Sequence, residues 1–152
     1  MPMKLKTARR RVALVVLALW VLSLGLPAAG FESQSYSYVP GAFVAVIGMV
    51  FGWLEFQFGA FANLILLGLC LVLLFGRRPW TILAWIAEAL ALWSFTWSEM
   101  PDDNNLNPIV HFLSGFYVWQ IAILLLAAYV TFEKKLMKAG YIEAPAPITL
   151  LS

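Results

Sequence analysis

The sequence predicts an all-α membrane protein, a four-helix transmembrane bundle with a short interfacial or re-entrant helix on the outer face before the second span. Apolar residues make up 62% of the 152 residues and charged residues only 12%, with a mean hydropathy of +0.85. A soluble core of ordinary composition cannot bury that much apolar surface, so we expect lipid to act as the solvent. The ten Lys and Arg residues fall in three groups, at residues 4–11, 77–78 and 134–138.

The distribution of charge predicts the sidedness of the chain. Basic residues that flank spans stay on the cytoplasmic side of a membrane. The opposite ends of the apolar stretches carry only acidic charge, at Glu32 and at residues 99–103. We therefore expect a multi-pass protein of the bacterial inner membrane, with both termini and the turn at residues 77–78 in the cytoplasm. Orientation and attraction to anionic lipid headgroups explain the basic side, so it predicts no nucleic-acid partner.

The first apolar stretch predicts a span over about residues 12–29. Its length is close to the ~20 residues that cross ~30 Å of hydrocarbon. A basic segment before an apolar run is also typical of a secretory signal peptide, but Pro27 disrupts the small-residue cleavage site. We therefore expect this segment to be retained as the first span. Tyr36 and Tyr38 follow in an outer loop, at the level of the headgroups.

The apolar stretch at residues 41–76 is too long for one crossing, because a single helix of this length would extend ~54 Å at ~1.5 Å per residue. Two full crossings would place the basic pair at residues 77–78 outside and contradict the charge pattern. We therefore expect a short helix over about residues 41–53 that lies flat on the outer face or dips into it. The second span then covers about residues 58–76.

The next segment predicts an antiparallel helical hairpin. A tight turn at residues 77–79 joins the second span to a third span over about residues 80–97. A polar outer loop follows at residues 98–106. The second and third spans are therefore expected to pack side by side.

The fourth span is predicted from a helix-start pattern. Asn107 and Pro108 are typical of an N-cap followed by the first helical residue. They predict a span over about residues 108–132, with the helix continuing through Lys138 and ending near Gly140. The chain thus divides into a transmembrane bundle at residues 1–140 and a mobile cytoplasmic tail at residues 141–152.

Glu88 is the most informative single residue of the predicted bundle. Counted from the turn, it lies ~14 Å into the bilayer. A charged carboxylate there costs at least ~3 kcal/mol, so we expect Glu88 to be neutral, hydrogen-bonded, or both. By the same count Asn63 and Gln120 lie at a similar depth, and we predict that the three residues form a buried polar cluster. Small residues with helical spacing predict that Glu88 faces the bundle, and these are Ala84, Ala87 and Ala91.

A second polar group is expected at the outer face, formed by Glu55, Gln57 and His111. Ser114 would lie one helical turn after His111, but that spacing is common and no oxyanion-stabilising loop is recognisable, so we predict no catalytic residues. A single Cys and a single His exclude the usual Cys/His zinc cages, and we predict no cofactor-binding or metal-binding residues. Cys70 can form no internal disulfide. The tryptophans are assigned to packing or to the interfacial belt.

Two short sequence patterns lie on the predicted spans. Phe61-Ala62-Asn63 opens the second span, after the short outer helix, and Gly115-Phe116-Tyr117-Val118-Trp119 lies in the fourth. With these patterns the chain resembles a loose class of small, uncharacterised four-helix bacterial inner-membrane proteins. In that class an aromatic-Ala-Asn pattern begins span two and a Gly-aromatic-x-Trp pattern marks span four. The resemblance implies a fold and a location rather than an activity.

The leading functional hypothesis is a non-catalytic interaction protein of the inner membrane, with the lipid bilayer and either a membrane protein or further copies of the chain as partners. An immunity protein against a membrane-active toxin and an assembly subunit of a membrane complex are two concrete forms. The alternative is a small proton-linked carrier or channel. In that case Glu88 takes up a proton, and Asn63 and Gln120 offer hydrogen-bonding groups.

Overall fold

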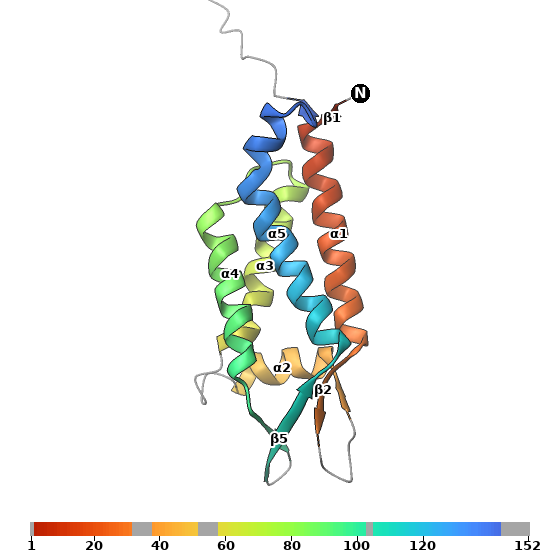
Figure 1. Ribbon diagram of the computed structural model, residues 1–152, viewed down its shortest axis with the longest axis vertical. Coiled ribbons are helices and arrows are strands. Elements are labelled where there is room, and N and C mark those ends of the chain that lie inside the picture. Colours follow the sequence, from red (N-terminus) through yellow and green to blue (C-terminus); the bar gives the residue numbers. More distant parts are fainter. Residues whose placement is uncertain (1, 32–37, 52–57, 103–104, 144–152) are drawn as a thin grey trace, which may run out of the picture.

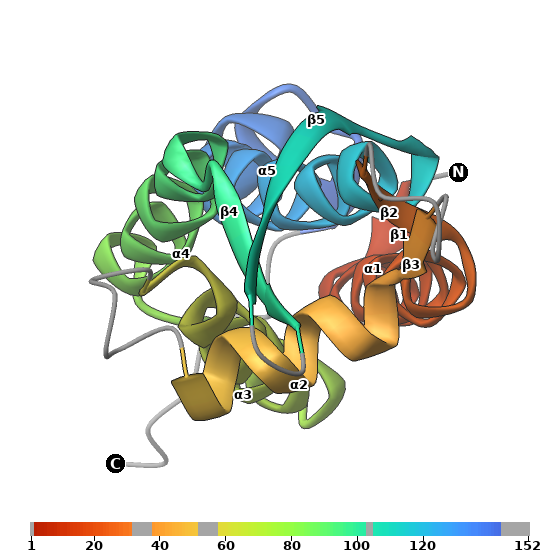
Figure 2. The same ribbon diagram turned by 90° about the horizontal axis from the view of Figure 1, so that it is seen from below.

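Four long helices form a bundle in the computed structural model, which describes residues 2–31, 38–51, 58–102 and 105–143. The helices are α1 (Leu5–Gly25), α3 (Ala62–Leu74), α4 (Thr81–Trp93) and α5 (Ser114–Lys138). They run side by side along the long axis of the molecule (Figure 1). A further helix, α2 (Gly41–Phe51), lies across one end of the bundle (Figure 2). The described residues are mostly helical, in agreement with the predicted class at this coarse level.

The first helix ends earlier than the sequence predicts. α1 stops at Gly25, and Leu26 adopts an extended backbone with φ −88° and ψ 153°. The cause is Pro27, which lacks an amide hydrogen and disfavours a helical conformation in the residue before it. Pro27–Phe31 instead forms strand β2. The predicted helical span over residues 12–29 is therefore wrong beyond Gly25.

A four-stranded antiparallel sheet covers the same end of the bundle as α2 (Figure 1). The sequence predicts no strands in these segments. In the register, Ala29 of β2 pairs with Val39 on one side and with Phe112 on the other. The strand order is β3-β2-β5-β4, with β3 at Tyr38–Pro40, β4 at Glu99–Asp102 and β5 at Asn105–Phe112.

The start of the last helix also differs from the prediction. Asn107 and Pro108 lie inside β5, which pairs with β2 on one side and with β4 on the other. This pairing holds the backbone extended as far as Phe112. α5 therefore begins at Ser114 rather than at Pro108. At its other end the helix continues through Lys138, as predicted.

Two short strands pair at the opposite end of the bundle. β1 (Met3–Lys4) and β6 (Ile142–Glu143) run parallel to each other, and Ile142 is buried. The prediction of a mobile tail from residue 141 is therefore wrong for these two tail residues. Residues 144–152 lie outside the described part of the chain.

α3 and α4 follow one another with a tight reversal between them. The chain turns at Gly76, whose φ of +74° is a backbone conformation that favours glycine. The Gly76 amide donates to the Leu73 carbonyl oxygen at 2.8 Å. Short 3₁₀-helices extend the hairpin at its far end: Phe58–Phe61 (η2) precedes α3, and Ser94–Thr96 (η3) follows α4.

α1 and α5 approach closely because of Gly115. This residue lies at the end of the bundle that the sheet and α2 cover, which we call the capped end. A Cβ atom at this position would lie 2.7 Å from the carbonyl oxygen of Leu26 and 2.9 Å from that of Pro27. Backbone atoms cannot move aside as a flexible side chain can, so glycine is required here. Gly68 of α3 is different, because a Cβ there would meet nothing within 4 Å.

α4 buries small residues and exposes large apolar ones. The buried residues of α4 are Ala84, Ala87, Glu88 and Ala91, which is the face that the spacing predicts. On the opposite face, Ile82 is 75% exposed. Such a surface is unusual for a soluble monomer. Large apolar residues are exposed on the other long helices too, among them Leu14, Val21, Leu64, Leu71, Ile121 and Leu124.

One helix among the described residues, α5, is long and apolar enough to cross a membrane. α1 is 21 residues long, but its first half carries Lys6 and the basic run at residues 9–11. The structure therefore supports one candidate crossing by helix length and composition, which is a coarser statement than the four predicted. Shorter apolar helical segments accompany α5, at Gly41–Phe51, Phe58–Leu74 and Thr81–Thr96.

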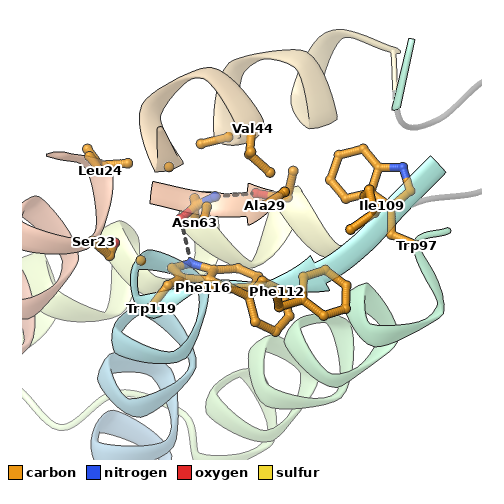
Figure 3. A pocket seen from close by; sticks show the side chains of 15 residues that line it. Ser23, Leu24, Ala29, Val44, Asn63, Trp97, Ile109, Phe112, Phe116 and Trp119 are labelled. Carbon is orange, nitrogen blue, oxygen red and sulfur yellow. Dashed lines mark hydrogen bonds between the residues drawn. The ribbon is translucent and has the colours of Figure 1, made fainter. Parts of the chain in front are cut away.

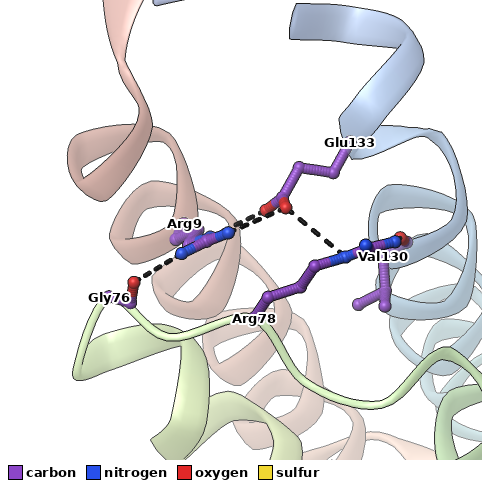
Figure 4. A network of polar contacts seen from close by, with 5 residues as sticks. All are labelled: Arg9, Gly76, Arg78, Val130 and Glu133. Carbon is purple, nitrogen blue, oxygen red and sulfur yellow. Dashed lines mark hydrogen bonds and ion pairs between the residues drawn. The ribbon is translucent and has the colours of Figure 1, made fainter. Parts of the chain in front are cut away.

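Arg9 connects three parts of the chain at the basic end of the bundle (Figure 4). Its Nε and Nη2 donate to the Glu133 carboxylate at 2.8 and 2.9 Å, and its Nη1 donates to the Gly76 carbonyl oxygen at 2.6 Å. Arg78 approaches the same carboxylate, with 3.6 Å between its Nε and Oε1. The Glu133 side chain is 1% exposed, and its hydrogen bond raises the pKa of Arg9. Segments of all three basic groups therefore meet at one end.

Replacing Glu133 by Gln is expected to destabilise the bundle by about 1–3 kcal/mol, because a largely buried guanidinium loses its counterion. The readout is the thermal unfolding midpoint of the protein in detergent. Glu143→Gln is the matched control, since Glu143 is exposed on β6. Equal midpoints for the two variants would contradict the role assigned to the Arg9–Glu133 pair.

Candidate functional site

The three polar residues predicted at mid-depth are all buried inside the bundle. Asn63 of α3 is 4% exposed, Glu88 of α4 is 6% exposed and Gln120 of α5 is 9% exposed. Each comes from a different helix, and the helical spacing of the neighbouring small residues turns it inward. The hydrogen bonds of Asn63 and Gln120, however, go to other groups.

Asn63 binds two indoles. Its Oδ1 accepts hydrogen bonds from Nε1 of Trp20 and from Nε1 of Trp119, each at 2.8 Å. Its Nδ2 donates to the Ala60 carbonyl oxygen at 2.9 Å. Both acceptor positions of the amide oxygen are therefore used. Since Trp20 lies on α1 and Trp119 on α5, one amide links three helices.

Gln120 of α5 donates a hydrogen bond to α4 close to Glu88, but the two side chains are not hydrogen-bonded to each other. Gln120 Nε2 donates to the carbonyl oxygen of Ala91, at 2.6 Å. Glu88 lies one turn away, and its Oε2 is buried with no hydrogen-bond partner among the described residues. No hydrogen bond joins Asn63, Glu88 and Gln120 to one another in this part of the chain. A buried polar oxygen without a partner is costly, which makes Glu88 the strongest candidate for a functional group.

A cavity of about 40 Å³ lies at the capped end, between α2, the sheet and the bundle. Figure 3 shows Val44 of α2 on one side of it, with Phe112 and Phe116 on the other. These two rings stack with centroids 4.1 Å apart. The lining is almost entirely apolar, and Asn63 contributes its main polar side chain. The cavity therefore suits a small apolar group and offers nothing to hold a charge.

α2 closes the cavity by packing tightly on the bundle. A Cβ atom at Gly48 would lie 2.8 Å from the Ala60 Cβ and 3.0 Å from the ring of Trp97. Asn63 and Trp119 line the cavity, whereas Gln120 and Glu88 do not. The hydrogen-bonded amide and indole thus form part of the cavity wall that faces the bundle interior.

Of the outer-face polar group predicted from the sequence, the structure describes only His111. Glu55 and Gln57 lie outside the described residues. His111 is exposed and belongs to β5, so Ser114 does not follow it on one helix and the predicted helical spacing is wrong. The imidazole lies over Gly30, which pairs with His111 from β2. A Cβ atom at Gly30 would come within 2.7 Å of His111 Nε2.

Sequence reasoning missed the indoles that satisfy Asn63. It assigned the tryptophans to packing or to the interfacial belt, which separates them from the polar residues. A signal was present, because Trp119 adjoins Gln120 and so shares its depth in the bundle. The Arg9–Glu133 pair was missed as well, since the sequence pattern places Glu133 only as an acid within a basic group.

Comparisons with known proteins add no assignment to this site. No family model matches the sequence, and neither the curated proteins nor the solved structures contain a match. Within the described ranges, no group of three or more His, Cys, Asp or Glu side chains is placed to hold a metal ion. The residues therefore have to be interpreted from their own geometry.

Asn63→Leu is expected to lower the free energy of unfolding by about 2–4 kcal/mol, because two largely enclosed indole N–H groups lose their acceptor. Thr131→Val is the control, since it removes the acceptor of a single exposed indole, Trp85, at 3.0 Å. That control is expected to cost less than about 1 kcal/mol. Chemical denaturation in detergent measures both, and similar losses would argue against a structural role of the Asn63 amide.

Proposed function

We propose that the chain is a four-crossing membrane protein whose role is non-catalytic interaction within the bilayer. The observation that carries the proposal is the apolar exterior of the bundle. Polar side chains such as Asn63 and Gln120 lie inside the bundle, while large apolar side chains cover its exterior. Such an exterior needs lipid or another membrane protein as its neighbour.

The proposed crossings are α1, α3 with η2, α4 with η3, and α5. In α1 the apolar part begins at Val12, directly after the basic run at residues 9–11. The segments Phe58–Leu74 and Thr81–Thr96 are shorter and would cross a thinner or locally adapted region of hydrocarbon. Their shared basic end supports a cytoplasmic location for the N-terminus, the hairpin turn and the end of α5.

An interaction role fits the distribution of polar groups better than a catalytic one. The cavity at the capped end is apolar, and His111 is exposed on β5. An assembly subunit of a bacterial inner-membrane complex and an immunity protein against a membrane-active toxin both require only a stable fold and an apolar surface. The exposed apolar faces of the four long helices supply that surface.

Cysteine labelling tests the proposed topology. Arg77→Cys and Glu99→Cys place thiols at opposite ends of the bundle, and the native Cys70 is fully buried and serves as an internal background. In intact bacterial cells a membrane-impermeant maleimide is expected to label Glu99→Cys, and to label Arg77→Cys only after the membrane is opened. Rapid labelling of Arg77→Cys from outside would refute the arrangement.

A second candidate, a proton-linked carrier or channel, is favoured by the unpartnered Oε2 of Glu88. A buried carboxyl group in a membrane segment is a functional hypothesis in its own right. It could take up a proton, with Gln120 one turn away along the same helical interface. Four helices would carry out such transport most readily as an oligomer.

Glu88→Gln separates the two candidates, because it removes the titratable group and nearly preserves shape. For the interaction protein, we expect no proton flux from the wild type in liposomes, and a stoichiometric complex when the chain is co-expressed with the products of neighbouring genes. Wild-type flux that Glu88→Gln abolishes and the exposed-site control Glu143→Gln preserves would favour the carrier. No complex with any neighbour would count directly against the interaction role.

A further inference from the structure

Three cations gather where α1 meets the end of α3. The Lys6 side chain packs against Gly76, because a Cβ there would lie 2.9 Å from Lys6 Cγ. The Arg10 Nε donates to the carbonyl oxygen of Leu74, the last residue of α3, at 3.0 Å. Arg77 follows Gly76 directly in the chain. We refer to Lys6, Arg10 and Arg77 as the α1–α3 cation cluster.

The cluster has no carboxylate to neutralise it among the described residues. The ion pairs in this part of the molecule join Glu133 to Arg9 and to Arg78. Glu143, the other acid of the basic end, lies on β6 and takes part in no ion pair between described residues. The carbonyl groups at the end of α3 supply only a partial negative charge. Lys6, Arg10 and Arg77 are all exposed, so they can reach a ligand outside the bundle.

An apolar surface continues from the cluster towards the middle of the bundle. Leu14 follows Arg10 by one turn of α1, so the two side chains lie on one face of that helix. Leu71 and Phe75 share a face at the end of α3 in the same way. All three apolar side chains are more than half exposed, at 58%, 55% and 75%. The surface therefore combines concentrated positive charge with an adjacent apolar wall.

We propose that the α1–α3 cation cluster binds the phosphate group of an anionic phospholipid, whose acyl chains lie along Leu14, Leu71 and Phe75. Arg and Lys side chains bind phosphate oxygens through charge-assisted hydrogen bonds. The cytoplasmic leaflet supplies anionic headgroups at the level of a basic helix end. A soluble phosphate would leave the apolar wall without a ligand, which favours the lipid. The lipid assignment rests on the membrane location proposed above.

The test compares ligands on the full-length protein in an uncharged detergent. Phosphatidylglycerol is expected to raise the thermal unfolding midpoint by about 5 °C, and phosphatidylcholine and inorganic phosphate to have little effect. The variant Lys6→Gln/Arg10→Gln/Arg77→Gln is expected to lose most of that rise. Lys134→Gln/Lys135→Gln/Lys138→Gln removes the same amount of charge from the end of α5. This variant is expected to retain the rise in the unfolding midpoint.

Each other outcome overturns a stated part of the proposal. Equal losses in the two triple variants would show general attraction to a basic surface and no site at the α1–α3 junction. A rise with inorganic phosphate as large as that with phosphatidylglycerol would replace the lipid by a soluble anion. If the triple variant fails to fold, Lys6→Gln/Arg77→Gln gives the same comparison and leaves the Arg10–Leu74 hydrogen bond intact. Binding in detergent micelles is independent of the labelling pattern, so a wrong topology would be recognised separately.

Discussion

The bundle depends on the neutralisation of one buried carboxylate. The Glu133 side chain of α5 is enclosed by α1 and by the turn that follows α3. An unpaired charge would be costly to hold there. Arg9 supplies the countercharge through two parallel hydrogen bonds and uses its remaining nitrogen on the Gly76 carbonyl group. The same contact therefore sets the position of α1 on α5 and the position of the α3–α4 turn on both. Glu133 is the only buried acid of the basic end among the described residues, and Arg78 is the one other cation that pairs with it there.

The opposite end is built by a different principle. The antiparallel sheet and α2 cap the helices, and Gly115 allows the backbone of α5 to lie directly against the residues that lead into β2. The outer strands β3 and β4 each have one edge with no strand partner within the described sheet. Such edges are not tolerated in hydrocarbon. The cap is therefore consistent with a location at the headgroups or in water, which agrees with the proposed orientation of the basic end towards the cytoplasm.

The buried polar residues separate into two kinds. Asn63 has its hydrogen bonds satisfied by two indoles and a backbone carbonyl group, as expected of a structural link between helices. Glu88 is held among alanines and has an oxygen without a partner in the described chain. The idea of one cluster that serves one purpose is therefore replaced by a structural amide near the cap and a separate carboxyl group deeper in the bundle. The candidates for a functional role are therefore Glu88 and the outer surfaces of the bundle.

The sequence by itself determined the order and approximate positions of the helices, the face of α4 that is buried, the continuation of α5 and the gathering of basic residues at one end. These features follow from local patterns, because helical spacing, proline and glycine act within a few residues of one another. Only the tertiary structure decided that residues 105–112 form a strand, that Trp20 and Trp119 bind Asn63, and that Arg9 pairs with Glu133. Arg9 and Glu133 are 124 positions apart, and Trp20 and Asn63 are 43 apart. No local pattern selects one partner among many at such distances, since the choice depends on how the completed helices pack.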